Sequence, residues 1–101
     1  MGEGRGEGGN KNMKLIVGLG NPGRAYAHNR HNMGFRCLNH LGKLHSIQVK
    51  RHHCQSQTGT GKIAGVEVLL AKPRTFVNLS GGAVGSLMRK YKIPVNDLIV
   101  I

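Results

Sequence analysis

Three short, almost wholly apolar runs constrain the fold of this chain more than any other feature. They are KLIVGL at residues 14–19, VEVLLA at 66–71 and LIVI at 98–101. Runs of this length without polar alternation are typical of strands buried on both faces, in sheets that are covered by helices. None is long enough to cross a bilayer. We therefore expect a single α/β domain, with a twisted, mixed β-sheet flanked by α-helices.

Two segments between these runs have the spacing of helices. We expect the first helix to begin around Asn32, to end near Leu44 and to face inward through Met33, Cys37, Leu38 and Leu41. For the second, Ser80 is a suitable N-cap and Pro94 a stop signal, and the inward stripe is Val84, Leu87, Met88 and Tyr91.

The polar stretches are expected to complete the sheet and its loops. Residues 46–52 and 54–64 are compatible with strands, with a hairpin turn at Ala64 and Gly65. Residues 72–78, which include Pro73, are expected to form a loop.

The two ends of the chain differ in character. Residues 1–12, MGEGRGEGGNKN, hold no residue that could anchor a core, so we expect a flexible glycine-rich tail before a domain at 13–101. The LIVI run comes last, and a buried strand usually continues into a covering helix or strand. We therefore expect the domain to be truncated at its C-terminus and the natural protein to be longer.

The chain is strongly basic. Residues 13–101 hold 13 Lys and Arg residues against two acids, Glu67 and Asp97, and this part accounts for the whole net charge of +11. A polyanion is the natural partner of such a surface. Nucleic acid is favoured over anionic lipid because no amphipathic basic helix stands out, although a charge that serves only solubility is the alternative.

Two patterns resemble cofactor or metal sites only weakly. Glycines 18, 20 and 23 fit the GxGxxG pattern of dinucleotide-binding loops, but no acid follows at 38–43 to bind a ribose. The same glycines could instead let the chain turn sharply, so that Asn21 projects at the mouth of the sheet, or Asn21 could be an ordinary turn residue. His52, His53 and Cys54 lack a second ligand pair for zinc, and Cys37 and Cys54 read as reduced thiols.

Three separated blocks resemble the bacterial-type peptidyl-tRNA hydrolase family in order and spacing. They are KLIVGLGNPG at 14–23, YAHNRHNMGF at 26–35 and KPRTFVNLSG at 72–81, and the resemblance extends over residues 13–101, the N-terminal portion of the family's domain. It implies a monomeric cytoplasmic enzyme of translation and ribosome rescue, with no metal, cofactor or obligate protein partner. Its substrate would be peptidyl-tRNA, whose ester bond between peptide and tRNA it would hydrolyse.

The resemblance also implies roles for individual residues. His31 would be the base that activates water, and Asn21 would distinguish blocked peptidyl from free aminoacyl substrates. Tyr26 would contact tRNA, while Phe76 and Asn78 would be further substrate contacts.

The family's remaining site residues follow the strand that ends here at Ile101. They include an acidic residue that holds the histidine in its basic form, a later asparagine and a group of basic residues that bind the substrate. Without them the imidazole lacks a fixed tautomer and orientation, so we expect the 101-residue chain alone to be weak or inactive. The alternative from another class is a non-catalytic, basic RNA-binding module that keeps the same scaffold.

Overall fold

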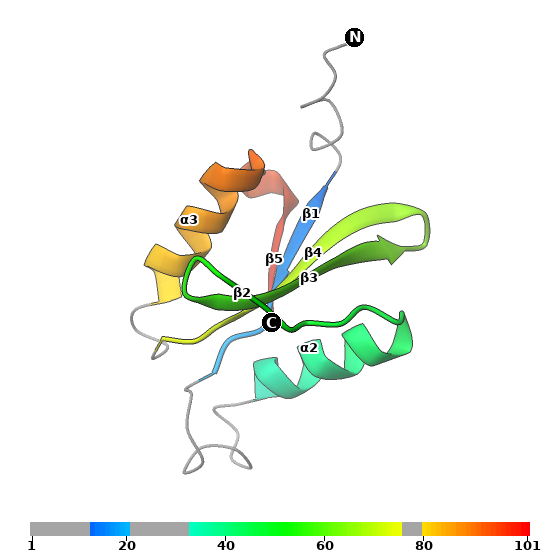
Figure 1. The fold of residues 1–101 in the computed structure, drawn as a ribbon. Helices are drawn as coiled ribbons and strands as arrows, with labels where there is room; N and C mark the ends of the chain where they lie inside the picture. Colours follow the sequence, from blue (N-terminus) through cyan, green and yellow to red (C-terminus); the bar gives the residue numbers. More distant parts are fainter. Residues whose placement is uncertain (1–12, 21–32, 76–79) are drawn as a thin grey trace, which may run out of the picture.

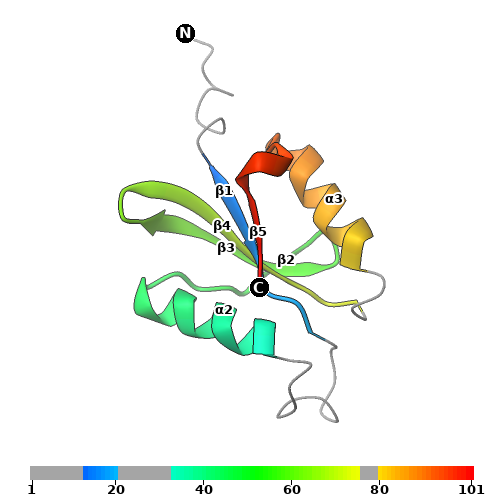
Figure 2. The same cartoon turned by 180° about the vertical axis from the view of Figure 1, so that it is seen from behind.

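The computed structural model describes residues 13–20, 33–75 and 80–101, which form a five-stranded mixed sheet with a helix on each face (Figures 1 and 2). The strands are β1 (Lys14–Val17), β2 (Arg51–His53), β3 (Ser56–Ile63), β4 (Val66–Pro73) and β5 (Leu98–Val100). The helices are α2 (Met33–Leu44), α3 (Ser80–Tyr91) and the short 3-10 helix η5 (Val95–Asp97). This architecture confirms the predicted fold class.

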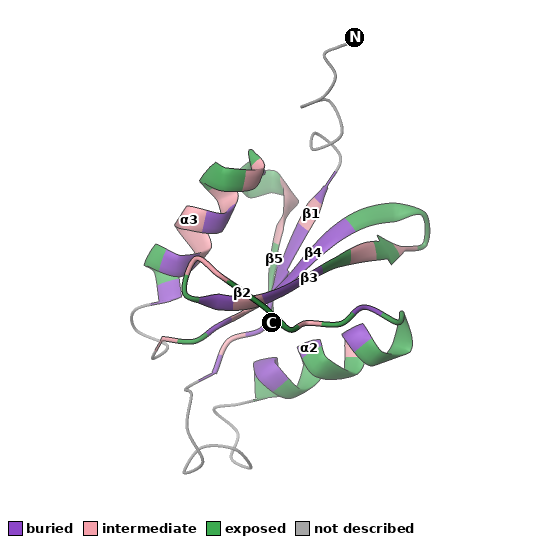
Figure 3. Cartoon of the chain, viewed as in Figure 1, coloured by how far each residue is buried: buried purple, intermediate pink, exposed green. Residues whose placement is uncertain are grey.

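Strand β1 lies inside the sheet, whose order is β2-β3-β4-β1-β5, and pairs in parallel with both β4 and β5. Its alternate side chains enter two separate cores. Leu15 and Val17 pack with Leu87 of α3, whereas Ile16 packs with Leu38 of α2. Both faces are thus covered by apolar side chains, as the uninterrupted run predicts, and Figure 3 shows the resulting buried centre.

The antiparallel part of the sheet contains two tight hairpins. Ala64 and Gly65 both have positive φ, 53° and 81°, which is the type I′ geometry of a two-residue hairpin and confirms the predicted turn. Cys54 and Gln55 join β2 to β3 in the same way, with φ of 50° and 59°. The sequence did not indicate this second turn, because neither residue is glycine or asparagine.

Two predicted strand limits are wrong. Residues 47–50 are not in a strand, so the expected strand at 46–52 shortens to β2. Lys72 and Pro73, expected in a loop, extend β4 and pair with Gln57 and Ser56. Beyond Ala71, strand β4 has no β1 partner, and such an edge-like position tolerates a proline.

The inward face of α2 differs from the predicted stripe. Met33 and Cys37 are exposed, and the buried positions are Gly34, Phe35, Leu38 and Gly42, with Leu41 half-buried. The cause is close backbone contact, since a Cβ on Gly18 would lie 2.3 Å from the Gly34 carbonyl oxygen. Glycine contributes nothing to an apolar pattern, so the sequence did not indicate this backbone contact. The predicted inward face of the helix was therefore rotated relative to the observed one.

The predicted stripe of α3 is confirmed. Leu87 is buried, and Val84, Met88 and Tyr91 pack partly buried against the same core. The helix ends before Pro94, because Lys92 adopts a φ of 56° and the Ile93 N–H donates to the Met88 carbonyl at 2.9 Å. Helix α2 ends in the same manner, with Ser46 at 58° and Ile47 bonded to Gly42 at 2.8 Å.

Strand β5 lies beside β1, with Ile99 opposite Ile16. It is not buried, however: Ile99 is 49% and Val100 51% exposed. Among the described residues no element covers its outer side, so β5 is an edge strand here. No helix in the described part of the chain is long and apolar enough to cross a membrane.

Candidate functional site

The side chains predicted for the site all lie outside the described residues. These are Asn21, Tyr26 and His31, in the segment 21–32, and Phe76 and Asn78, in 76–79. The described residues that flank these segments define where the chain leaves the sheet and where it returns.

Both segments follow the carboxyl ends of neighbouring parallel strands. Val17 of β1 is in register with Ala71 of β4, and the Gly18 N–H donates to the Ala71 carbonyl at 2.9 Å. Residues 19 and 20 continue from β1 and residues 74 and 75 from β4, at the same edge of the sheet. This carboxyl edge is where open α/β sheets bind their ligands.

Leu19 joins three elements at this edge. Its carbonyl accepts the Phe35 N–H from the first turn of α2 at 3.2 Å, and its N–H donates to the Ile101 carbonyl after β5 at 3.3 Å. The absence of side chains on Gly18 and Gly34 allows this approach, because a Cβ on Gly34 would lie 2.4 Å from the Leu19 oxygen. The two described ends of segment 21–32 are therefore held together, and the end of β5 lies beside them.

Two cations and an aromatic ring lie at the end of β4. The Lys72 Nζ is 6.0 Å and the Arg74 Cζ 5.8 Å from the centre of the Phe35 ring. Burial lowers the pKa of Lys72, and the neighbouring charge of Arg74 lowers it further. The edge that leads into segment 76–79 therefore carries positive charge over an apolar platform, which suits phosphate or carboxylate groups.

Sequence reasoning missed Phe35, Lys72 and Arg74 as site residues. All three lie within the recognised blocks, in NMGF and KPRTF, and that was the available signal. A lysine or arginine before a loop is usually a solvated surface residue, so the residue types alone did not single them out.

Two further polar features border segment 76–79. The Thr75 hydroxyl is buried and has no hydrogen-bond partner among the described residues. The Arg74 N–H donates to the Gln55 carbonyl at 2.8 Å, which fastens the β2–β3 turn to this edge. Within the described ranges, no three His, Cys, Asp or Glu side chains are grouped closely enough to hold a metal ion, and Cys37 and Cys54 are free thiols.

Comparison with known proteins identifies the family. The peptidyl-tRNA hydrolase family model matches residues 15–101. A peptidyl-tRNA hydrolase of Dehalococcoides mccartyi strain CBDB1 is 51% identical over 89 residues, which are 88% of this chain and 47% of that protein. One from Desulforudis audaxviator is also 51% identical over 89 residues, covering 88% of this chain and 46% of its own length.

A solved structure gives the same result. The crystal structure of peptidyl-tRNA hydrolase from Acinetobacter baumannii aligns with a TM-score of 0.83 at 37% identity, over 89% of this chain and 46% of the other. The chain thus spans about half the length of the relatives it matches. The match includes the described edge and the blocks on either side of it, and the chain belongs to the peptidyl-tRNA hydrolase family.

Proposed function

We propose that this chain carries the part of a peptidyl-tRNA hydrolase site that activates water, with His31 as the base. The observation that carries the proposal is the flanking geometry. Gly20 immediately precedes Asn21, and Met33 lies two residues after His31. Leu19, next to Gly20, accepts the Phe35 N–H from the helix that begins at Met33, so these two flanking positions lie close together. Thr75, which precedes Phe76, follows the end of β4, the strand in register with β1, so the described parts of all three family blocks meet at one edge of the sheet.

The proposed reaction is the addition of water to the ester carbonyl that joins the peptide to tRNA. His31 accepts a proton as the water oxygen attacks, and it returns that proton to the ribose oxygen as the ester bond breaks. A neutral imidazole with an ordinary pKa of about 6.5 is mostly unprotonated at pH 7, which suits this role. Asn21 donates from its amide to the substrate, and such a donor to the oxyanion lowers the barrier by about 3 kcal/mol.

The remaining predicted residues bind the substrate in this proposal. Tyr26 and Phe76 stack on bases of the tRNA end, each contact contributing about 1 to 3 kcal/mol, and Asn78 holds the peptide or the tRNA end. Lys72 and Arg74 add positive charge beside this site, close enough to Phe35 to share its surface. Residues 13–101 form the domain portion that acts, as a cytoplasmic monomer without metal or cofactor, and residues 1–12 take no part.

A chimera tests the proposal sharply. Residues 13–101 replace the matching part of the D. mccartyi enzyme, whose remaining length supplies the other half of the domain. We expect this chimera to release tRNA from N-blocked peptidyl-tRNA, and His31→Ala to lower the rate by about 100- to 10,000-fold, the range of a general base. We expect the 101-residue chain alone to be weak or inactive.

The matched control is His45→Ala, because His45 is an exposed histidine that follows α2. It should leave turnover unchanged. If His31→Ala keeps the rate of the parent chimera, His31 is not the base. If no chimera cleaves the ester but all of them bind tRNA, the non-catalytic RNA-binding module becomes the correct interpretation.

A further inference from the structure

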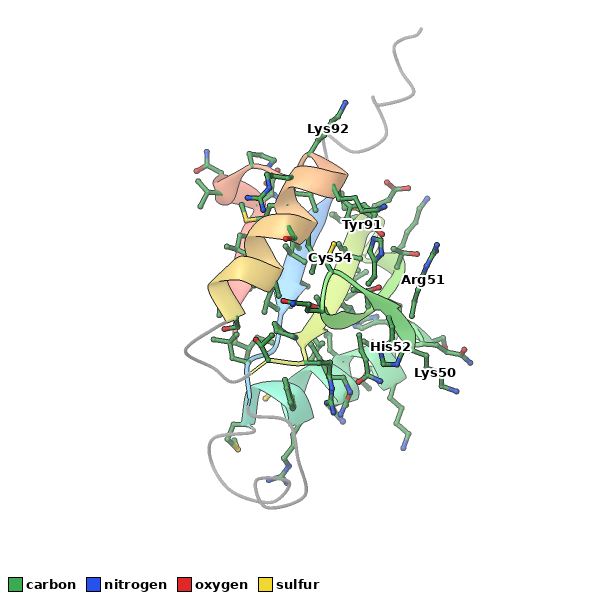
Figure 4. The ribbon with its side chains drawn as sticks, turned by 60° about the vertical axis from the view of Figure 1, so that its left-hand side comes forward. Lys50, Arg51, His52, Cys54, Tyr91 and Lys92 are labelled. Carbon is green, nitrogen blue, oxygen red and sulfur yellow. The ribbon has the colours of Figure 1, made fainter. Side chains whose placement is uncertain are left out.

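A group of exposed basic residues lies along strand β2 and the end of α3, and we call it the basic patch. It consists of Lys50, Arg51 and His52, in and beside edge strand β2, and Lys90 and Lys92 at the end of α3. Figure 4 shows Lys92 at the far end of the helix and Tyr91 beside the turn that carries Cys54, with Arg51 and His52 of β2 and Lys50, just before it, lying further along the same side. Segments 40 residues apart in the chain thus contribute to one surface.

Aromatic packing fixes the two halves of the basic patch against each other. The rings of His53 and Tyr91 meet edge to face, with centroids 5.9 Å apart and an interplanar angle of 76°. Burial is the main reason that the pKa of His53 is lowered, and the charges of Lys90 and Arg51 lower it further. Cations from both elements therefore lie close to the same imidazole, and the ring contact holds them at a defined spacing.

The charge of the basic patch is not neutralised within the described part of the chain. Of the two acids there, Asp97 is bound to Lys14 at 2.5 Å, and Glu67 lies opposite Lys62 in the β3–β4 hairpin. Lys92 also occupies a position with a φ of 56°, where glycine is usually more stable. Lysine at this position adds positive charge at a conformational cost of about 1 kcal/mol.

The exposed apolar surface of the described residues lies elsewhere. Among these residues the large exposed apolar side chains are Met33, Leu44, Val66, Val95, Ile99, Val100 and Ile101, and none of them belongs to the basic patch. A membrane-binding surface normally combines cations with apolar residues that enter the lipid. Cations without such residues suit a partner whose charge is regularly spaced and fully exposed, as in a nucleic-acid backbone.

The basic patch also leads to the candidate site. His53 of β2 is opposite Ser56, which is opposite Pro73, so β2 and β4 end at the same edge of the sheet. The hydrogen bond from Arg74 to Gln55 joins the β2–β3 turn to that edge. A polyanion bound along β2 can therefore extend toward the positive end of β4.

We propose that the basic patch is a second RNA contact, which binds the phosphate backbone at a surface distinct from the candidate catalytic edge. The proposal rests on the proposed function only in the choice of RNA as the nucleic acid. It assigns to this chain a positioning surface for the body of its substrate, since backbone contacts fix orientation without reading sequence.

Salt-dependent binding tests this assignment. The 101-residue chain is titrated into a fluorescent RNA hairpin that carries no peptide, over a series of salt concentrations. The variant Arg51→Gln/Lys90→Gln removes one cation from each half of the basic patch. We expect it to bind about tenfold or more weakly at 0.1 M salt and to reduce the slope of log K against log salt by about 2.

Two controls separate a local effect from one of net charge and fold. Lys43→Gln/Lys62→Gln lowers the charge equally at exposed positions outside the basic patch, and should retain nearly the full slope. Arg51→Lys/Lys90→Arg keeps both charges and should bind like the parent chain. Circular dichroism confirms that each variant is folded.

Several outcomes would overturn the proposal. They are equal losses in the two glutamine variants, no loss in the Arg51 and Lys90 variant, or the absence of RNA binding by the parent chain. Binding to phosphatidylserine vesicles that is lost with Arg51 and Lys90, without binding to RNA, would assign the surface to lipid instead. Because the hairpin has no ester bond, failure of the proposed hydrolysis would leave these results unaffected.

Discussion

Substituting Gly34 by alanine should destabilise the fold, although alanine is the better helix former. Gly34 lies in the first turn of α2, and its new Cβ would lie 2.4 Å from the Leu19 oxygen, 2.5 Å from the Leu19 nitrogen and 2.7 Å from the Ile101 oxygen. All three are backbone atoms, so no side chain can rotate to make room. The helix must move away from β1 by about 1 Å to restore ordinary contact distances.

The expected loss follows from what this movement breaks. Two backbone hydrogen bonds meet at Leu19, at 3.2 and 3.3 Å, and their loss costs about 2 kcal/mol. Overpacking of this kind costs about 1 to 3 kcal/mol more, and the greater helix propensity of alanine offsets about 1 kcal/mol of the total. We therefore expect a net loss of about 3 kcal/mol in the free energy of unfolding, or roughly 15 °C in Tm for a domain of this size.

Urea denaturation followed by circular dichroism at 222 nm measures this loss. The matched control is Gly82→Ala in α3, where no heavy atom lies within 4 Å of the new Cβ, and we expect it to stabilise the chain by about 0.5 to 1 kcal/mol. The reasoning is refuted if Gly34→Ala matches or exceeds the parent chain in stability with an unchanged m-value. Equal effects of the two substitutions would likewise show that backbone contact does not decide the result.

Three further predictions concern local features. Gln55→Gly relieves a φ of 59° at an exposed turn position and should raise the free energy of unfolding by about 0.5 to 1 kcal/mol, measured by the same denaturation assay. Because the pKa of His53 is lowered in the native state, the unfolded chain binds a proton more readily, so stability should fall as pH decreases through about 6.5. His53→Gln should flatten that part of the pH profile, and an unchanged profile would contradict the assignment. Asp97→Asn removes the partner of Lys14, which is 41% exposed, and should cost about 0.5 kcal/mol at low salt and less in 1 M NaCl.

The features that the sequence predicts well are those that arise from apolar side chains. The buried run at 14–19 contains central strand β1, and the predicted stripe through Leu87 is the inward face of α3. The turn at Ala64 and Gly65 was predictable because glycine favours positive φ. These patterns are local, so a short window of sequence contains all of their information.

The errors arise where backbone atoms, rather than side chains, make the contact. Gly18 and Gly34 decide the rotation of α2, yet glycine adds nothing to an apolar stripe. Cys54, Gln55 and Lys92 adopt positive φ without being glycine or asparagine, so the turn at β2 and the exact end of α3 depend on tertiary packing. No window of sequence contains that packing.

The candidate site likewise has parts that the sequence predicts and parts that only the structure reveals. Its edge follows from strand order, which three apolar runs and their connections largely determine. Lys72 and Arg74 are part of the candidate site because β4 extends past Ala71 and places both cations near the ring of Phe35. The roles of His31 and Asn21 rest on the family blocks and stay predictions for the chimera to test.

The two borders of the sheet should behave differently in concentrated solution. The short strand β2 carries Arg51, with Lys50 just before it, on a border that no other described element covers, and these like charges repel an approaching copy. On its outer side, strand β5 has no partner among the described residues; Ile99 and Val100 are half-exposed, and no charged side chain lies within the strand. Self-association of the 101-residue chain should therefore begin at β5, and a lysine in place of Ile99 is the simplest change to keep the protein dispersed.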